Sequence, residues 1–160
     1  MMSESPGFQE NVTGFSDRRV DRTDEPIPAV EKQLKRLVAD GDLLAAVLAG
    51  EDGLTIVSSE SESEERSDPE IVSALVGHIS RIRGFAEVSF FKDRVRDLMI
   101  GDVSGLSCHC RFFDLMDQPV TLAIVLRNSE RAEEILERGE TGIRRIIRIH
   151  YLGEPSDGTC

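Results

Sequence analysis

The sequence contains no apolar run near the roughly 20 residues that a membrane-spanning helix requires. Its N-terminal stretch is polar and lacks the cationic start and continuous apolar core of a secretory signal. We therefore expect a cytoplasmic protein that does not insert into a membrane.

Cysteine is scarce, because the chain has only Cys108, Cys110 and Cys160. Three cysteines, an odd and small number, do not resemble the disulfide framework of a secreted protein, so reduced thiols are expected. Cys108-His109-Cys110 is the one group that suggests a metal site. On a strand, however, the two cysteines point to one face and His109 to the other, so they cannot converge on one ion. We expect no metal and interpret the thiols as small buried hydrophobes.

Positive charge is also in deficit, with 19 basic against 30 acidic residues and a net charge of −11. This balance disfavours binding to a phosphate backbone, so no nucleic-acid partner is expected. Basic residues nevertheless cluster between positions 81 and 96, and two interpretations stay open. They balance nearby acids such as Asp93 and Asp97, or they dock an acidic partner surface. The cluster consists of Arg81, Arg83, Lys92, Arg94 and Arg96.

Signatures of nucleotide binding and catalysis are missing. Neither the Walker pattern nor the dinucleotide fingerprint occurs. His78 has no serine or cysteine nucleophile in a recognisable setting beside it. We therefore predict no catalytic residue, no cofactor and no enzymatic activity.

Residues 1–27 mix both charge signs without periodicity, which predicts a disordered arm before a domain over residues 28–150. Apolar residues at helical spacing predict a first helix from Pro28 to Gly41. The stretch "LAAVLAGEDGLTIVSS" then predicts two strands, over 43–49 and 54–59, joined by a tight turn at Asp52-Gly53. The acidic run over 60–70 is either a solvated loop or a docking site for a basic partner.

Asp68-Pro69 predicts the start of a second helix that runs to about Phe90. Its apolar residues form a stripe too broad for one packing surface, so we expect it to contact both its own sheet and a second subunit. One side carries Ile71, Leu75, His78, Ile79, Ile82 and Phe85, and a neighbouring band carries Val72 and Val76.

The rest of the chain predicts three strands, over 95–103, 106–116 and 120–127, with a turn at Asp117-Gln118-Pro119. Short connections favour antiparallel neighbours. A long helix capped by Ser129 follows and ends near Arg148, and residues 151–160 are expected to be a flexible tail.

This order of elements, with "AAVLAGEDGLTIVSS" and "VTLAIVLRNSERAEEILERG", resembles the Roadblock family, which includes dynein light chains and bacterial partners of Ras-like polarity GTPases. The resemblance covers residues 28–148. It implies an α+β sandwich of order αββαβββα with a five-stranded antiparallel sheet, helix two on one face and helices one and three on the other. It also implies a homodimer through helix two and the third strand. We assign that interface to Val72, Val76, Ile79, Arg83, Leu98 and Ile100, and partner docking to Arg81, Lys92, Arg94 and Arg96.

The expected function is that of a noncatalytic homodimeric regulator or scaffold that binds a small Ras-like GTPase and stimulates its GTP hydrolysis. Two alternatives stay open. One is a PAS-like or profilin-like small-molecule sensor, and the other is a structural adaptor that acts independently of nucleotide.

Overall fold

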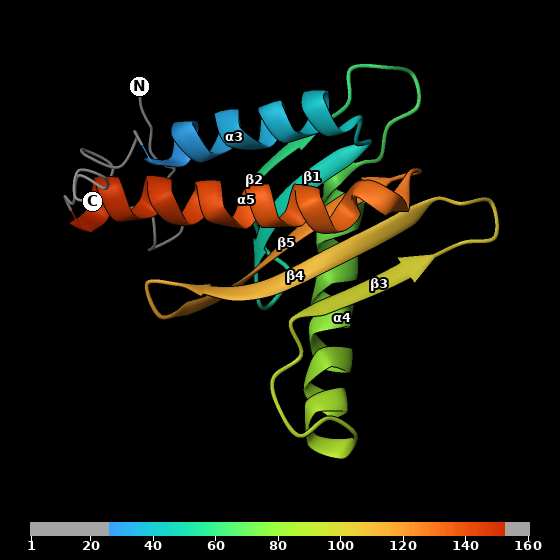
Figure 1. Cartoon of the computed structure of the whole chain (residues 1–160), viewed down its shortest axis with the longest axis vertical. Coiled ribbons are helices and arrows are strands. Elements are labelled where there is room, and N and C mark those ends of the chain that lie inside the picture. The colour runs from blue at the N-terminus through green and yellow to red at the C-terminus, as the bar shows by residue number, and fades with distance from the viewer. Residues whose placement is uncertain (1–25, 153–160) are drawn as a thin grey trace, which may run out of the picture.

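The computed structural model describes residues 26–152 and shows an α+β sandwich around one five-stranded antiparallel sheet (Figure 1). The strand order is β2-β1-β5-β4-β3, so β2 and β3 form the two edges. The elements, in chain order, are α3 (Pro26–Gly41), β1 (Ala45–Gly50), β2 (Thr55–Glu60), α4 (Pro69–Ser89), β3 (Asp97–Gly101), β4 (Ser107–Leu115), β5 (Gln118–Leu126), the 3-10 turn η1 (Ser129–Arg131), α5 (Ala132–Ile147) and the π-helical turn η2 (Arg148–Leu152). The predicted order and class of fold are confirmed.

The hairpin that opens the sheet forms because its turn residues adopt the required backbone. Gly53 has φ of 89°, a conformation that side chains disfavour, and Asp52 accepts a hydrogen bond from the Leu54 amide. Strand β1 is buried along Ala45–Ala49, as its apolar run predicts, because helices cover both faces of the sheet there.

One face of the sheet is covered by α3 and α5, which lie side by side in Figure 1. Their apolar stripes, represented by Leu34 and Ile143, join Leu122 and Ile124 of β5 in a single core cluster. Within residues 26–152, α4 is the one helix on the other face, and its Val72, Val76 and Ile79 form a second cluster with residues of β1, β4 and β5. The predicted distribution of the helices over the two faces is therefore confirmed.

Helix α4 reaches this position by close contact with the β1–β2 turn. A Cβ added at Gly77 would lie 3.2 Å from the Asp52 carbonyl oxygen, and one added at Gly53 would lie 3.1 Å from the Gly77 Cα. The absence of both side chains lets the turn and the helix approach closely. Beyond this contact α4 continues past the sheet, at the bottom of Figure 1.

Some predicted boundaries differ from the structure. The first helix begins at Pro26, inside the predicted 1–27 arm, and the last helical region is capped by Asn128, not Ser129. The tight turn after β4 lies at Met116-Asp117, which adopt positive φ, and Pro119 belongs to β5. The rest of the predicted arm and residues 153–160 of the predicted tail lie outside the described residues. Within 26–152, no helix is long and apolar enough to cross a membrane.

Candidate protein-interaction surface

Helix α4 has two apolar faces, of which one is buried against the sheet and the other is exposed. Val72, Val76 and Ile79 are at most 5% exposed and pack against the sheet of the same chain. Ile71, Ile82 and Phe85, by contrast, are 52–72% exposed. Large apolar side chains gathered on one helix face usually mark a contact surface. We call Ile71, His78, Ile82 and Phe85, which follow one another along this face, the α4 stripe.

The predicted dimer residues are therefore divided between core and surface. Val72, Val76 and Ile79 hold α4 on its own sheet and are not available to a second chain in this conformation. Arg83 is mostly buried, with its guanidinium 4.7 Å from the centre of the Phe112 ring and 3.3 Å from a Glu51 oxygen.

Strand β3 supplies a second accessible surface beside α4. It lies at the edge of the sheet, where one side of its backbone has no strand partner among the described residues. Leu98 packs against the same core cluster as Leu75 of α4, while Met99 and Ile100 are 56% and 44% exposed. An exposed, apolar edge strand is a template for pairing with another chain.

The predicted docking residues also fall into two groups. Arg94 pairs with Asp114, and Arg96 pairs with Asp97 and Glu133, so these two balance nearby acids. Arg81 and Lys92 are exposed and have no carboxylate within ion-pair distance among residues 26–152. Arg81 does contact the Nδ1 atom of His78 at 3.3 Å. Arg81 and Lys92 are the basic side chains of the cluster that remain available to a partner.

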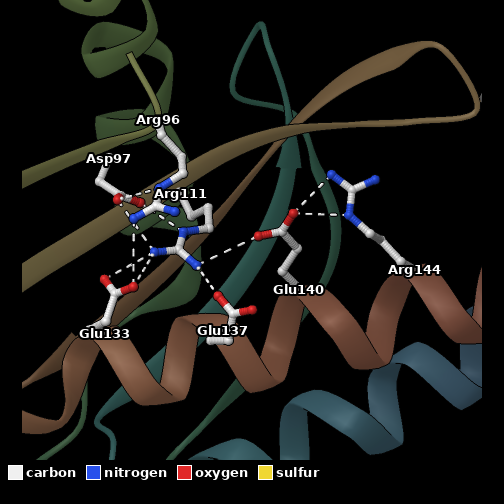
Figure 2. A network of polar contacts seen from close by, with 7 residues as sticks. All are labelled: Arg96, Asp97, Arg111, Glu133, Glu137, Glu140 and Arg144. Atoms are coloured by element: carbon white, nitrogen blue, oxygen red, sulfur yellow. Dashed lines mark hydrogen bonds and ion pairs between the residues drawn. The ribbon is translucent and has the colours of Figure 1, made fainter. Parts of the chain in front are cut away.

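A buried arginine that sequence reasoning missed joins the edge of the sheet to α5 (Figure 2). The side chain of Arg111, on β4, is 1% exposed and faces four carboxylates. Asp97 of β3 lies 2.8 Å from its Nε, and three glutamates of α5 lie 3.0–3.6 Å from its terminal nitrogens. The glutamates are Glu133, Glu137 and Glu140.

This cluster shifts the protonation equilibria of its members. Partial burial alone would raise the pKa of Asp97, but hydrogen bonds and charge from Arg111 and Arg96 outweigh it, so the pKa is lowered. Burial would lower the pKa of Arg111, yet its bonds to Asp97 and Glu133 raise the pKa. The cluster thus keeps its charges and fixes β3, β4 and α5 relative to one another.

The Cys-His-Cys group has the predicted orientation. Cys108 and Cys110 lie in the core beneath α4, and His109 lies on the opposite face, with its Nε2 3.1 Å from the Ser107 hydroxyl. The hydrogen bond between the thiols lowers the pKa of Cys108, whereas that bond and burial raise the pKa of Cys110. Burial lowers the pKa of His109 despite the nearby Asp97. Residues 26–152 contain no cluster of three or more side chains suited to hold a metal.

Two open clefts bear on the small-molecule alternative. One, of about 300 Å³, lies between β3 and the start of α5, where Met99, His109 and Leu136 meet the Asp97 and Glu133 carboxylates. Both carboxylates already bind Arg111. The other cleft, of about 390 Å³, lies beside the hairpin turns and is lined by Gly50, Glu51, Asp52, Gln118 and Pro119. Neither is the enclosed, mostly apolar pocket typical of a ligand site.

No family model matches the sequence, and no curated protein matches it either. Solved structures do match. The gliding protein MglB from Thermus thermophilus superposes with a TM-score of 0.63 at 12% identity, over 77% of this chain and 91% of that one. The Roadblock/LC7 domain from Streptomyces avermitilis gives 0.54 at 15% identity, over 78% and 98%. The blue-light-absorbing form of the PixJ GAF domain from Thermosynechococcus elongatus gives 0.52 at 11% identity, over 85% and 93%.

These likenesses define the class of the molecule by its fold. The chain has a Roadblock-like fold, as the order of its elements predicts, with the same layered arrangement as MglB and the Roadblock/LC7 domain. The blue-light-absorbing GAF domain has a similar fold as well.

Proposed function

We propose that this protein is a noncatalytic, homodimeric regulator or scaffold that binds a small Ras-like GTPase in the cytoplasm. The observation that carries the proposal is the exposed apolar α4 stripe beside the unpaired edge strand β3, on a Roadblock-like fold. The resemblance of the sequence to Roadblock proteins implies both the dimer and the GTPase partner.

The dimer surface consists of the side chains that the fold leaves accessible. Ile71, Ile82 and Phe85 of α4 and Ile100 of β3 are exposed, and Leu98 lies between core and surface. Burying an exposed apolar side chain contributes roughly 1.5–3 kcal/mol, so a second copy that covers this set gains substantial free energy. Val72, Val76 and Ile79 contribute indirectly by holding α4 in place.

The GTPase contact uses Arg81 and Lys92, the basic side chains of the predicted docking set that have no carboxylate partner among residues 26–152. Such charges increase encounter rates and select partners of opposite charge. The similar structure from Thermus thermophilus is that of a gliding protein, which supports a role in polarity or motility. Any stimulation of hydrolysis would act by positioning the switch loops of the GTPase.

The test uses purified protein as bait in lysate of its own cells, loaded once with a nonhydrolysable GTP analogue and once with GDP. We expect a small GTPase, identified by mass spectrometry, in one nucleotide state only. The double variant Arg81→Glu/Lys92→Glu should no longer recover the GTPase. The control Leu54→Ser, which replaces an exposed apolar residue just before β2, should still recover it. Recovery of a GTPase equally in both states would instead establish a nucleotide-independent adaptor. Recovery of no GTPase would contradict the proposal.

A small-molecule sensor is the second candidate, favoured by the likeness to the PixJ GAF domain. A ligand that binds the folded chain raises its melting temperature. A stabilising ligand found in a metabolite screen, together with no GTPase recovery, would support the sensor.

A further inference from the structure

Basic side chains without a carboxylate partner gather on the helix layer formed by α3 and α5. All of them are exposed, and we call them the α3–α5 basic patch. The patch consists of Lys32, Lys35 and Arg36 of α3, Arg145 of α5 and Arg148 of η2. Among residues 26–152, the other Lys and Arg side chains outside ion-pair distance of a carboxylate are Arg81 and Lys92. In a chain of net charge −11, this concentration of unpaired positive charge indicates a surface for an anionic partner.

The basic residues of the two helices form one surface because α3 and α5 run antiparallel on the same face of the sheet (Figure 1). A Cβ added at Gly142 would lie 2.8 Å from the Gln33 Cδ atom, and Arg138 lies 3.4 Å from Asp40. The N-terminal half of α3 therefore lies along the C-terminal half of α5. Their apolar stripes are buried in one core cluster, so the charged side chains project away from the sheet.

Few acids share this surface. In the stretches 28–36 and 140–150, the acids are Glu31, which has no basic partner within the described chain, and Glu140, which pairs with Arg144 at 2.8 Å. Asp52 and Asp117 belong to turns of the sheet and not to the helix layer. The other ends of α3 and α5 are acidic, so the patch occupies one end of the layer. The acids at those ends are Asp40, Asp42, Glu130, Glu133, Glu134 and Glu137.

The arrangement of these charges fits the headgroups of an anionic membrane. They are spread over two neighbouring helices, whereas the two clefts described above are lined by other residues. Spread basic charges suit an extended array of lipid phosphates, and each contributes about a fivefold gain in binding at an anionic surface. Ile149, which is 39% exposed, follows Arg148 and adds an apolar contact. Because the apolar stripes of both helices are buried in the core, the chain would lie on the headgroups without inserting a helix.

We infer that the α3–α5 basic patch docks this protein on an anionic membrane surface as a peripheral protein. The inference goes beyond the proposed GTPase regulator and does not depend on it. Helix α4 lies on the opposite face of the sheet, so a docked chain keeps Arg81 and Lys92 accessible. Acids on that face repel the membrane only weakly, because the intervening helix layer of about 10 Å exceeds the Debye length of about 8 Å.

Vesicle binding of the full chain tests the inference. The natural chain should cosediment with vesicles made of equal parts of phosphatidylcholine and phosphatidylglycerol, and not with vesicles of phosphatidylcholine alone. Raising the salt concentration should release the chain, because screening weakens the attraction between the patch and the headgroups.

Charge reversal locates the contact. Lys32→Glu/Arg36→Glu on α3 and Arg145→Glu/Arg148→Glu on the C-terminal side of the layer should each lower the partition coefficient by roughly thirtyfold, since two basic contributions are lost. The matched control is Arg81→Glu/Lys92→Glu, which changes the net charge by the same amount on the α4 side of the sheet. This control should bind the vesicles as the natural chain does.

Several outcomes would overturn the inference. Equal binding to both kinds of vesicle would exclude a role for the anionic headgroups, and binding to neither would exclude the membrane. An equal loss in the control would show that net charge decides the binding, and not the patch. If the natural chain ignores vesicles but captures an acidic protein that neither patch variant captures, the patch serves a protein partner instead. Circular dichroism checks the fold of each variant, and the salt dependence of the natural chain requires no variant.

Discussion

At the scale of single residues, the buried ion pairs of Arg111 predict a large effect of its truncation on stability. Its guanidinium is buried against four carboxylates, so truncation removes both the compensating charge and the packing of its stem. Removing one partner of a buried ion pair strongly destabilises a protein, although the glutamates here are partly solvated. We expect Arg111→Ala to lower the free energy of unfolding by about 2–4 kcal/mol in urea denaturation. Arg94→Ala, which breaks an exposed pair with Asp114, should change it by less than about 1 kcal/mol. Equal effects of the two changes would contradict the structural role of Arg111.

The lowered pKa of Asp97 leads to a prediction of how the stability of the fold depends on pH. Its pKa is lowered in the folded chain, so the carboxylate stabilises the fold above its unfolded pKa of about 3.9. That contribution is lost as pH falls through the lower folded pKa. Asp97→Asn should therefore reduce the loss of stability on acidification below about pH 4, measured by urea denaturation across a pH series. The same change in an Arg111→Met background should have a smaller effect, because the principal partner is gone. An effect of the same size in both backgrounds would rule out the coupling.

The sequence predicts some of these residues and not others. The orientation of Cys108, His109 and Cys110 follows from the alternation of side chains along a strand, and the structure confirms it. Arg111 lies in the same strand, but its partners come from β3 and α5, and pairing across distant segments leaves no local pattern. The available signal was a charged residue within the otherwise apolar "CRFF" run.

At the scale of elements, the contact between α4 and the hairpin turn gives a prediction with a matched control. Glycine to alanine within a helix usually stabilises by about 0.5–1 kcal/mol. Gly84 has no atom within 4 Å of an added Cβ, so Gly84→Ala should show that gain. At Gly77 the Cβ would lie 3.2 Å from a backbone oxygen of the turn, and overpacking of this kind costs about 1–3 kcal/mol. Gly77→Ala should thus destabilise the protein in thermal denaturation. A gain at both positions would show that the turn yields to the added methyl group.

The elements themselves were largely predictable because periodicity and turn residues are local signals. The division of α4 into a buried and an exposed face was harder to predict from the sequence. The sequence shows a broad apolar stripe, but only the position of the helix on the sheet decides that Val76 is buried and Phe85 exposed. A substitution at Val76 would consequently test folding, whereas one on the α4 stripe tests assembly.

At the scale of the whole molecule, the order of the elements predicts one sheet with helices on both faces. A second subunit has no such signal in the sequence, and the fold indicates one only through surface that the chain leaves exposed. Residues 26–152 leave the apolar side chains of the α4 stripe and of the edge strand β3 exposed. The fold decides which of the predicted dimer residues are accessible: Val72, Val76 and Ile79 face the sheet of their own chain, whereas Leu98 is partly buried and Ile100 is exposed.

Dimerisation makes the melting temperature depend on protein concentration, because dissociation accompanies unfolding. For a dimer of this size, each tenfold increase in concentration should raise the melting temperature by roughly 2–4 °C. Ile82→Glu places a charge in the α4 stripe without touching the core, so this variant should lose the concentration dependence while keeping its circular dichroism spectrum. Leu54→Glu, an equally polar change at an exposed apolar position on the hairpin, should keep it. If Ile82→Glu still melts at a higher temperature when concentrated, the chains associate through a different surface.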